Sequence, residues 1–184
     1  MEIDQLQKIQ NVIKEEYLSK DQTKIEENDI DDKGNPFSMC RDIVGHKDIE
    51  YRIYRFDPNQ EKLFPYFCDI KGLNKICDYI IFAERKDLLC IFLIELKGSA
   101  GSPEKQLDIS EGFVKFILNR AESINTPIDK EVIIRKIGIK DTRSREKTEI
   151  KFYENFSYNS KSYALIQGFK SLRLAVLIDA PIDQ

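Results

Sequence analysis

The chain has 184 residues, of which 41% are hydrophobic and 33% charged, and its net charge at pH 7 is −3. This length suits one domain with a substantial core, and the hydrophobic content argues against a disordered chain. No apolar run approaches the ~20 residues that span a bilayer, and the N-terminal residues show no basic region or long apolar run of a signal peptide, so we expect a cytoplasmic protein with no membrane partner.

Apolar residues recur at helical spacing near the N-terminus. Leu6, Ile9 and Ile13 belong to a stripe that predicts an amphipathic helix over residues 3–19. Residues 20–36 are polar and acidic and end in Gly-Asn-Pro, a composition that predicts a loop or a mobile connection.

Strand patterns dominate the next part of the chain. Alternating residues predict a strand over 49–56, whereas residues 60–75 give no clear pattern. Two apolar runs separated by a charged turn at 84–87 predict a hairpin over 76–96.

A second helix is expected after the hairpin, with Ser102 as its N-cap and Pro103 at its first position. The elements expected from there on are a helix at 103–122, a strand at 132–139, a charged loop at 141–147, a strand at 150–156, an ambiguous segment at 163–169 and a buried strand at 172–178.

Cysteine and histidine are too few and too scattered to suggest zinc chemistry. Cys40, Cys68, Cys77 and Cys90 form no Cys-x-x-Cys pair, and His46 is the only histidine. A structural zinc site needs closely spaced Cys and His ligands, so this inventory argues strongly against one. A mechanism that uses a histidine base would depend on His46 alone.

Charged residues stand at the open end of the predicted hairpin. Asp78 begins the first strand, and Glu95 and Lys97 end the second, so antiparallel pairing would bring them together. Glu95 and Lys97 are two residues apart and share one face of their strand. Charges in a buried strand are costly unless a metal, a partner or a substrate compensates them. The alternative is an ordinary surface ion pair at the end of a strand.

This stretch resembles the core of the PD-(D/E)xK nucleases, the restriction-endonuclease-like superfamily. Asp78 matches the first acid, and Glu95-Leu96-Lys97 matches the second acid and the lysine. Cys77 stands where the proline that gives the family its name would stand. The match covers about 30 of the 184 residues.

The resemblance implies an α/β fold with a restriction-endonuclease-like core, in the order αβββαβ, whose mixed central sheet is flanked by helices. The elements expected from periodicity follow the same order. Residues 1–184 would then form one nuclease-like domain. Within it, residues 1–36 supply the N-terminal helix and acidic loop, residues 49–139 the core, and residues 140–184 a basic C-terminal addition with a final strand.

The resemblance also implies a metal-dependent nuclease that hydrolyses phosphodiester bonds, with DNA as the expected substrate. Asp78, Glu95 and the backbone carbonyl of Leu96 would bind Mg²⁺ or Mn²⁺, because these ions prefer oxygen ligands. Lys97 would orient the attacking water or stabilise the transition state.

Three further residues are weaker candidates for the same site. Gln106, early in the second predicted helix, would hydrogen-bond water or a phosphate, unless it is an ordinary exposed helical glutamine. Several members of the superfamily take another acid from the first helix, and Glu15 and Glu16 are candidates by location only.

Basic residues concentrate in the C-terminal part of the chain. Residues 132–176 hold ten Lys or Arg against four acidic residues, a balance that would attract a phosphodiester substrate. Solvated surface charges are the alternative. The members are Arg135, Lys136, Lys140, Arg143, Arg145, Lys147, Lys151, Lys161, Lys170 and Arg173.

The chain shows no separate specificity domain, which suggests a homodimer or a subunit of a larger defence or repair assembly. Two other functions stay open at this point. One is a catalytically silent nuclease-fold module that binds nucleic acid or a protein partner, and the other is an interaction protein whose resemblance to the nucleases is accidental.

Overall fold

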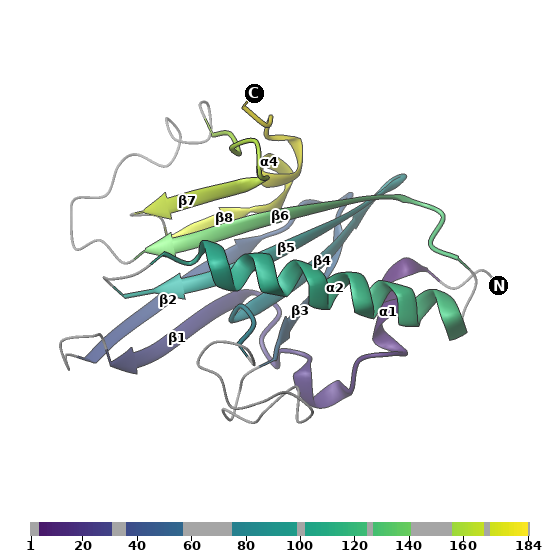
Figure 1. The fold of residues 1–184 in the computed structure, drawn as a ribbon, viewed down its shortest axis with the longest axis horizontal. Coiled ribbons are helices and arrows are strands. Elements are labelled where there is room, and N and C mark those ends of the chain that lie inside the picture. Colours follow the sequence, from purple (N-terminus) through teal and green to yellow (C-terminus); the bar gives the residue numbers. More distant parts are fainter. Residues whose placement is uncertain are drawn as a thin grey trace.

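The computed structural model describes residues 4–30, 36–56, 75–98, 102–124, 127–140, 156–167 and 170–183. These ranges contain two β-sheets and three α-helices (Figure 1). Within them, no helix combines the length and the apolar character that crossing a membrane requires.

The larger sheet has five strands in the order β3-β4-β5-β6-β7. Neighbours are antiparallel from β3 to β5 and parallel from β5 to β7, and helix α2 (Glu104–Ile124) makes the crossover from β5 to β6. The strands are β3 (Glu50–Arg55), β4 (Tyr79–Arg85), β5 (Leu88–Lys97), β6 (Glu131–Lys140) and β7 (Tyr163–Gln167).

These elements confirm the expected strand at 49–56, the hairpin at 76–96, the helix at 103–122 and the strand at 132–139. The hairpin turn is shorter than expected. Arg85 pairs with Leu88, which leaves only Lys86 and Asp87 in the turn, and Lys86 adopts a φ of 51°. The ambiguous segment at 163–169 forms β7 over its first five residues.

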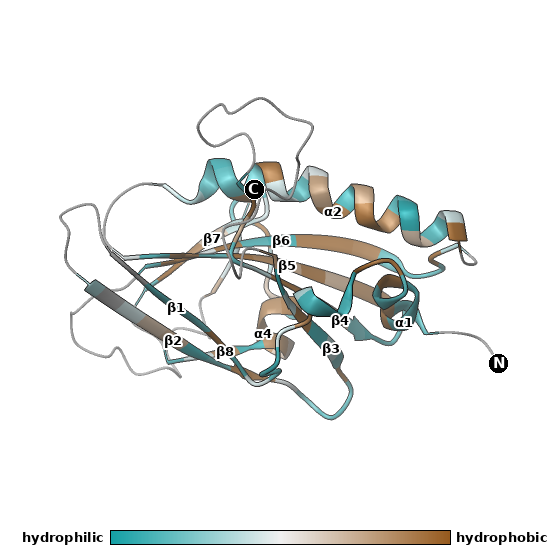
Figure 2. Cartoon of the chain, turned by 90° about the horizontal axis from the view of Figure 1, so that it is seen from below, coloured by the Kyte–Doolittle hydropathy of each residue, from teal (hydrophilic) through white to brown (hydrophobic). Residues whose placement is uncertain are grey.

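The two faces of the five-stranded sheet are covered differently. Helix α1 (Gln5–Gln10) and α2 pack on one face, where their apolar side chains meet those of β4 and β5. The second sheet and helix α4 (Leu174–Asp179) pack on the other face. Figure 2 shows α2 on one side of the large sheet and β1, β2 and β8 on the opposite side.

The second sheet corrects the expectation of a loop at 20–36. Its order is β1-β2-β8, formed by β1 (Lys24–Ile30), β2 (Pro36–Val44) and β8 (Ser171–Arg173). β1 pairs with β2 along its whole length, from Lys24 with Asp42 to Ile30 with Pro36. This pairing satisfies the backbone of an acidic segment whose own residues favour a loop. Residues 31–35 lie outside the described residues.

The N-terminal helix is much shorter than the predicted 3–19. Asp4 caps it by accepting a hydrogen bond from the N–H of Gln7 at 2.6 Å, and the helix ends at Gln10. A 3₁₀ turn (Glu15–Tyr17) follows, and the chain then runs along β3, where the N–H of Ser19 donates to the Ile53 carbonyl at 2.8 Å. Contacts with β3 therefore replace the helix that the stripe predicts.

The predicted strand at 172–178 is also wrong for most of its length. The chain leaves β8 after Arg173 and forms α4 instead. Leu174, Leu177 and Ile178 are buried, and this spacing of three and four residues places them on one side of a helix. The charged loop at 141–147 and all but Phe156 of the strand expected at 150–156 lie outside the described residues, and Phe156 is not in a strand.

Candidate active site

The hairpin of β4 and β5 brings the two predicted acids together. Tyr79 pairs with Ile94, so the register, continued by one residue, sets Asp78 opposite Glu95. The Asp78 carboxylate is held against β5, where its Oδ2 accepts a hydrogen bond from the N–H of Leu96 at 2.6 Å. The two carboxylates therefore lie side by side at the end of the hairpin, as the residue pattern predicts.

Glu95 is almost completely buried, with 1% of the residue exposed. Its Oε1 forms an ion pair with Nζ of Lys97 at 2.6 Å, whereas its Oε2 has no hydrogen-bond partner among the described residues. The side chain of Lys97 is 30% exposed, so it extends from the buried carboxylate toward solvent. The site thus holds a buried acid with only one of its two oxygens engaged.

Burial makes ionisation of both acids unfavourable. It is the main cause that raises the pKa of Asp78 to about 7 and the pKa of Glu95 to about 8. The charge of Asp78 raises the pKa of Glu95 further, while Lys97 lowers the pKa of both acids. A positive charge placed between the two carboxylates would favour their ionised forms.

These groups fit a hard divalent cation. Two adjacent carboxylates, one of them with an unengaged buried oxygen, offer the oxygen ligands that Mg²⁺ and Mn²⁺ bind. Leu96, whose carbonyl is the third predicted ligand, already contacts Asp78 through its N–H. No group of three or more His, Cys, Asp or Glu side chains suited to a metal occurs in the described part of the chain. The cation would therefore need the carbonyl oxygen and water to complete its coordination.

Helix α2 supports the segment that precedes Asp78. Nε2 of Gln106 donates a hydrogen bond to the Ile76 carbonyl at 2.6 Å, and Oγ of Ser110 accepts one from the N–H of Cys77 at 2.7 Å. Gln106 is therefore anchored to backbone two residues before Asp78. Its predicted contact with water or a phosphate stays a prediction.

The sequence interpretation missed Glu27 and Arg55, which also act on Asp78. Oε2 of Glu27 on β1 and Nη2 of Arg55 on β3 form an ion pair at 3.1 Å. The charge of Glu27 raises the pKa of Asp78, and that of Arg55 lowers it. Ile25 is buried in β1, but one apolar residue among polar neighbours does not indicate a strand from the sequence.

The acids expected on the first helix lie elsewhere. Glu15 and Glu16 are exposed residues of the 3₁₀ turn that follows α1. Glu16 forms an ion pair with Lys14 at 3.3 Å. His46 is exposed and contacts Asp48, away from the two buried acids.

Several residues of the basic segment have partners inside the fold. The guanidinium of Arg135 lies 4.6 Å from the ring centroid of Tyr158. Lys136 is buried between carboxylates of α2 at 2.7 and 2.8 Å, and Lys161 pairs with Glu104 at 3.0 Å. The members Arg143, Arg145, Lys147 and Lys151 lie outside the described residues, so the predicted attraction of a substrate stays a prediction.

No family model, curated protein or solved structure matches this chain. The function must therefore be inferred from the chemistry of the residues. Two acids with raised pKa values and a lysine within ion-pair distance can bind a cation and place positive charge beside it. Such a site can stabilise the negative charge that develops on a phosphate during hydrolysis.

Proposed function

We propose that the protein is a nuclease of the PD-(D/E)xK type that hydrolyses phosphodiester bonds, with DNA as the expected substrate and Mg²⁺ or Mn²⁺ as cofactor. The observation that carries this proposal is the state of Glu95. It is buried opposite Asp78, one of its oxygens contacts Lys97, and the other has no hydrogen-bond partner among the described residues.

A divalent cation would offset the repulsion between the two ionised acids. Ionised Asp78 and Glu95 repel each other in a buried setting, and the single charge of Lys97 is placed on one oxygen of Glu95. A bound cation offsets both negative charges, and it would polarise the phosphodiester and acidify a water molecule.

Lys97 supplies the positive charge that the reaction requires at the solvent side of the site. Its ammonium group can donate hydrogen bonds to phosphate oxygens, which become more negative in the transition state. Its position two residues after Glu95 fixes it on the same face of β5 as the acid. Asp78 is oriented by the N–H of Leu96 and Glu95 by Lys97, so both acids are held in place before a substrate binds.

The arrangement of the large sheet supports the proposal. Helix α1, the strands β3, β4 and β5, helix α2 and the strand β6 follow the order αβββαβ that the resemblance implies. β1 and β2 are inserted between α1 and β3 and form a second sheet. Both acids and the lysine come from the central hairpin of this order, as the motif requires.

One observation favours a second candidate, a catalytically silent module that binds nucleic acid or a protein partner. The 2.6 Å ion pair between Lys97 and Glu95 compensates part of the buried charge without a metal. In such a module Lys97 and Glu95 would serve only to form this ion pair. It leaves Oε2 of Glu95 without a hydrogen-bond partner among the described residues, and burial still raises the pKa of both acids, and for this reason we prefer the nuclease.

The test is to incubate the purified protein with plasmid, linear duplex and single-stranded DNA and with RNA, in Mg²⁺, Mn²⁺, Ca²⁺ or EDTA. We expect cleavage in Mg²⁺ and Mn²⁺, little in Ca²⁺ because its looser coordination misplaces the reacting groups, and none in EDTA. Absence of cleavage of every substrate, or full activity in EDTA, would contradict the proposal.

A further inference from the structure

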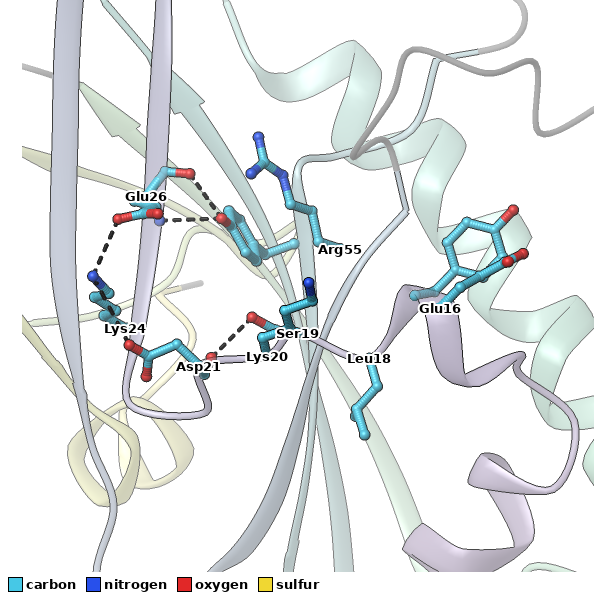
Figure 3. Close-up of a pocket in the computed structure, with 10 residues that line it drawn as sticks. Glu16, Leu18, Ser19, Lys20, Asp21, Lys24, Glu26 and Arg55 are labelled. Atoms are coloured by element: carbon cyan, nitrogen blue, oxygen red, sulfur yellow. Dashed lines mark hydrogen bonds and ion pairs between the residues drawn. The ribbon is translucent and has the colours of Figure 1, made fainter.

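A pocket of about 280 Å³ is connected to the candidate active site through Arg55 and Tyr79, although Asp78, Glu95 and Lys97 do not line it. It is lined by residues 16–21, by β1 and by Arg55 and Tyr79 (Figure 3). Tyr79 directly follows Asp78 in the chain, and Arg55 lowers the pKa of Asp78. The volume is near the lower end of the roughly 300–1,000 Å³ typical of small-molecule sites.

Hydrogen bonds hold the walls of this pocket in place. The hydroxyl of Tyr79 donates to the carbonyl of Glu26 at 2.7 Å and accepts from its N–H at 3.1 Å, which ties β4 to β1. The N–H of Ser19 donates to the carbonyl of Ile53 at 2.8 Å, which fixes the segment 16–21 against β3. The pocket is therefore formed before any ligand binds.

Two basic residues of the pocket lining can donate to an anionic ligand: Lys20, and Arg55 through the N–H groups that do not contact Glu27. Lys24 pairs with both Asp21 and Glu26, at 3.9 and 3.3 Å. Lys20, an exposed residue of the wall, has no ionic or hydrogen-bond partner among the described residues. Arg55 forms an ion pair with Glu27 at 3.1 Å, and Figure 3 shows both Lys20 and Arg55 at the pocket.

An aromatic ring completes the wall. Tyr17 is partly exposed and stacks on Phe56, with ring centroids 5.2 Å apart and an interplanar angle of 25°. Rings held in this way serve as stacking surfaces for unpaired bases, without preference for sequence. Two cations and a partly exposed aromatic ring are features that can bind the phosphate and the base of a nucleotide.

We propose that this pocket binds one unpaired nucleotide of the substrate strand, beside the phosphodiester held at Asp78 and Glu95. The base lies on Tyr17, and its phosphate lies between Lys20 and Arg55. The placement of this nucleotide beside the reacting phosphodiester rests on the proposed nuclease function, whereas the binding of a nucleotide in the pocket does not. Because a base must be unpaired to stack on Tyr17, the preferred substrate is single-stranded or locally unpaired.

The test is the equilibrium binding of a fluorescent single-stranded oligothymidylate in EDTA, where cleavage is suppressed. Lys20→Gln should make the slope of log affinity against log salt shallower by ~0.7, the value for one phosphate contact on a single strand. Tyr17→Leu keeps an apolar contact with Phe56 but removes the stacking surface, and it should weaken binding about tenfold. Lys47→Gln, on an exposed lysine outside the pocket, is the control and should change neither value. Thermal melts of each variant check that it is folded.

Unchanged affinity and salt slope in both folded pocket variants would overturn the pocket assignment, as would tighter binding of a matched duplex than of the single strand. Failure of the nuclease proposal looks different. In that case no cleavage occurs in Mg²⁺ or Mn²⁺, yet Lys20→Gln and Tyr17→Leu still weaken binding of the oligothymidylate. Cleavage by the wild type with unaltered binding in both variants would instead retain the nuclease and remove the pocket.

Discussion

Glu95 stands in surroundings that oppose its own ionisation. Its pKa is raised from 4.5 to about 8, and that of Asp78 from 3.8 to about 7, mainly because both are buried. The folded state therefore binds more protons than the unfolded state between these values, and the free energy of unfolding should fall as the pH rises from about 4 to about 8. Glu95→Gln replaces one of the two titrating acids by a group that does not titrate, and it should make the free energy of unfolding depend less on pH. Urea denaturation at about pH 5 and about pH 8 measures the free energy of unfolding. Identical pH dependence in the wild type and the variant would contradict a raised pKa of Glu95 in the folded state.

The same side chains should control the chemistry. Asp78→Asn, Glu95→Gln and Lys97→Ala should each lower the cleavage rate at least ~100-fold, equivalent to ~3 kcal/mol, because in the proposed mechanism each group acts on the cation or on the transition state. Glu15→Gln is the matched control, since Glu15 is exposed and lies in the 3₁₀ turn outside the site. Wild-type cleavage by any of the first three variants would remove that residue from the site.

At the scale of single residues, the motif alone was enough to place Asp78, Glu95 and Lys97 together. A two-residue spacing and antiparallel pairing determine their positions within one hairpin. Glu27 and Arg55 could not be found in this way, because their approach to Asp78 depends on how the second sheet packs against the first. The hydrogen bond from Gln106 to the Ile76 carbonyl likewise depends on the docking of α2.

Among the elements, those with long apolar runs were predictable, and those defined by their partners were not. β5 is buried along nearly its whole length, so its sequence indicates a central strand. β1 is acidic and becomes a strand through its pairing with β2. The segment 174–179 is a short apolar run that fits either a buried strand or a helix, and it forms a helix that buries Leu174, Leu177 and Ile178 on one side.

The close packing of α2 on β6 depends on a glycine beside the site. Gly138 pairs with Glu95 across the two strands, and a Cβ there would lie 2.5 Å from Cγ of Pro103 and 3.0 Å from the Tyr163 hydroxyl oxygen. Gly138→Ala should therefore force the start of α2 away from the sheet and lower the free energy of unfolding by ~1–3 kcal/mol. Gly112→Ala is the control, because nothing lies within 4 Å of the added carbon and alanine favours helix by ~0.5–1 kcal/mol. Chemical denaturation compares the two, and a Gly138→Ala variant as stable as the wild type would contradict this packing argument.

For the whole molecule, the basic C-terminal segment provides a test of how substrate approaches. Arg135, Lys136 and Lys161 have partners within the fold, so attraction of a nucleic acid would fall to other members of the segment. Charge reversal at Arg143, Arg145 and Lys147 should weaken binding of every sequence about equally. It should also make the salt slope shallower by ~0.7 for each phosphate of a single strand that the variant no longer neutralises. The rate of cleavage of bound substrate should change much less, because phosphate contacts of this kind position the strand. An unchanged salt slope would place the substrate path elsewhere.

The central claim is that Asp78 and Glu95 together bind a divalent cation, and calorimetric titration of the protein with Mn²⁺ tests it most directly. We predict one site per chain in the wild type, with affinity that rises as the pH increases through about 7 to 8, because both carboxylates must lose their protons to bind the ion. Glu95→Gln should abolish this binding, whereas Glu15→Gln should preserve it. Absence of binding to the wild type, or equal binding to Glu95→Gln, would contradict the claim.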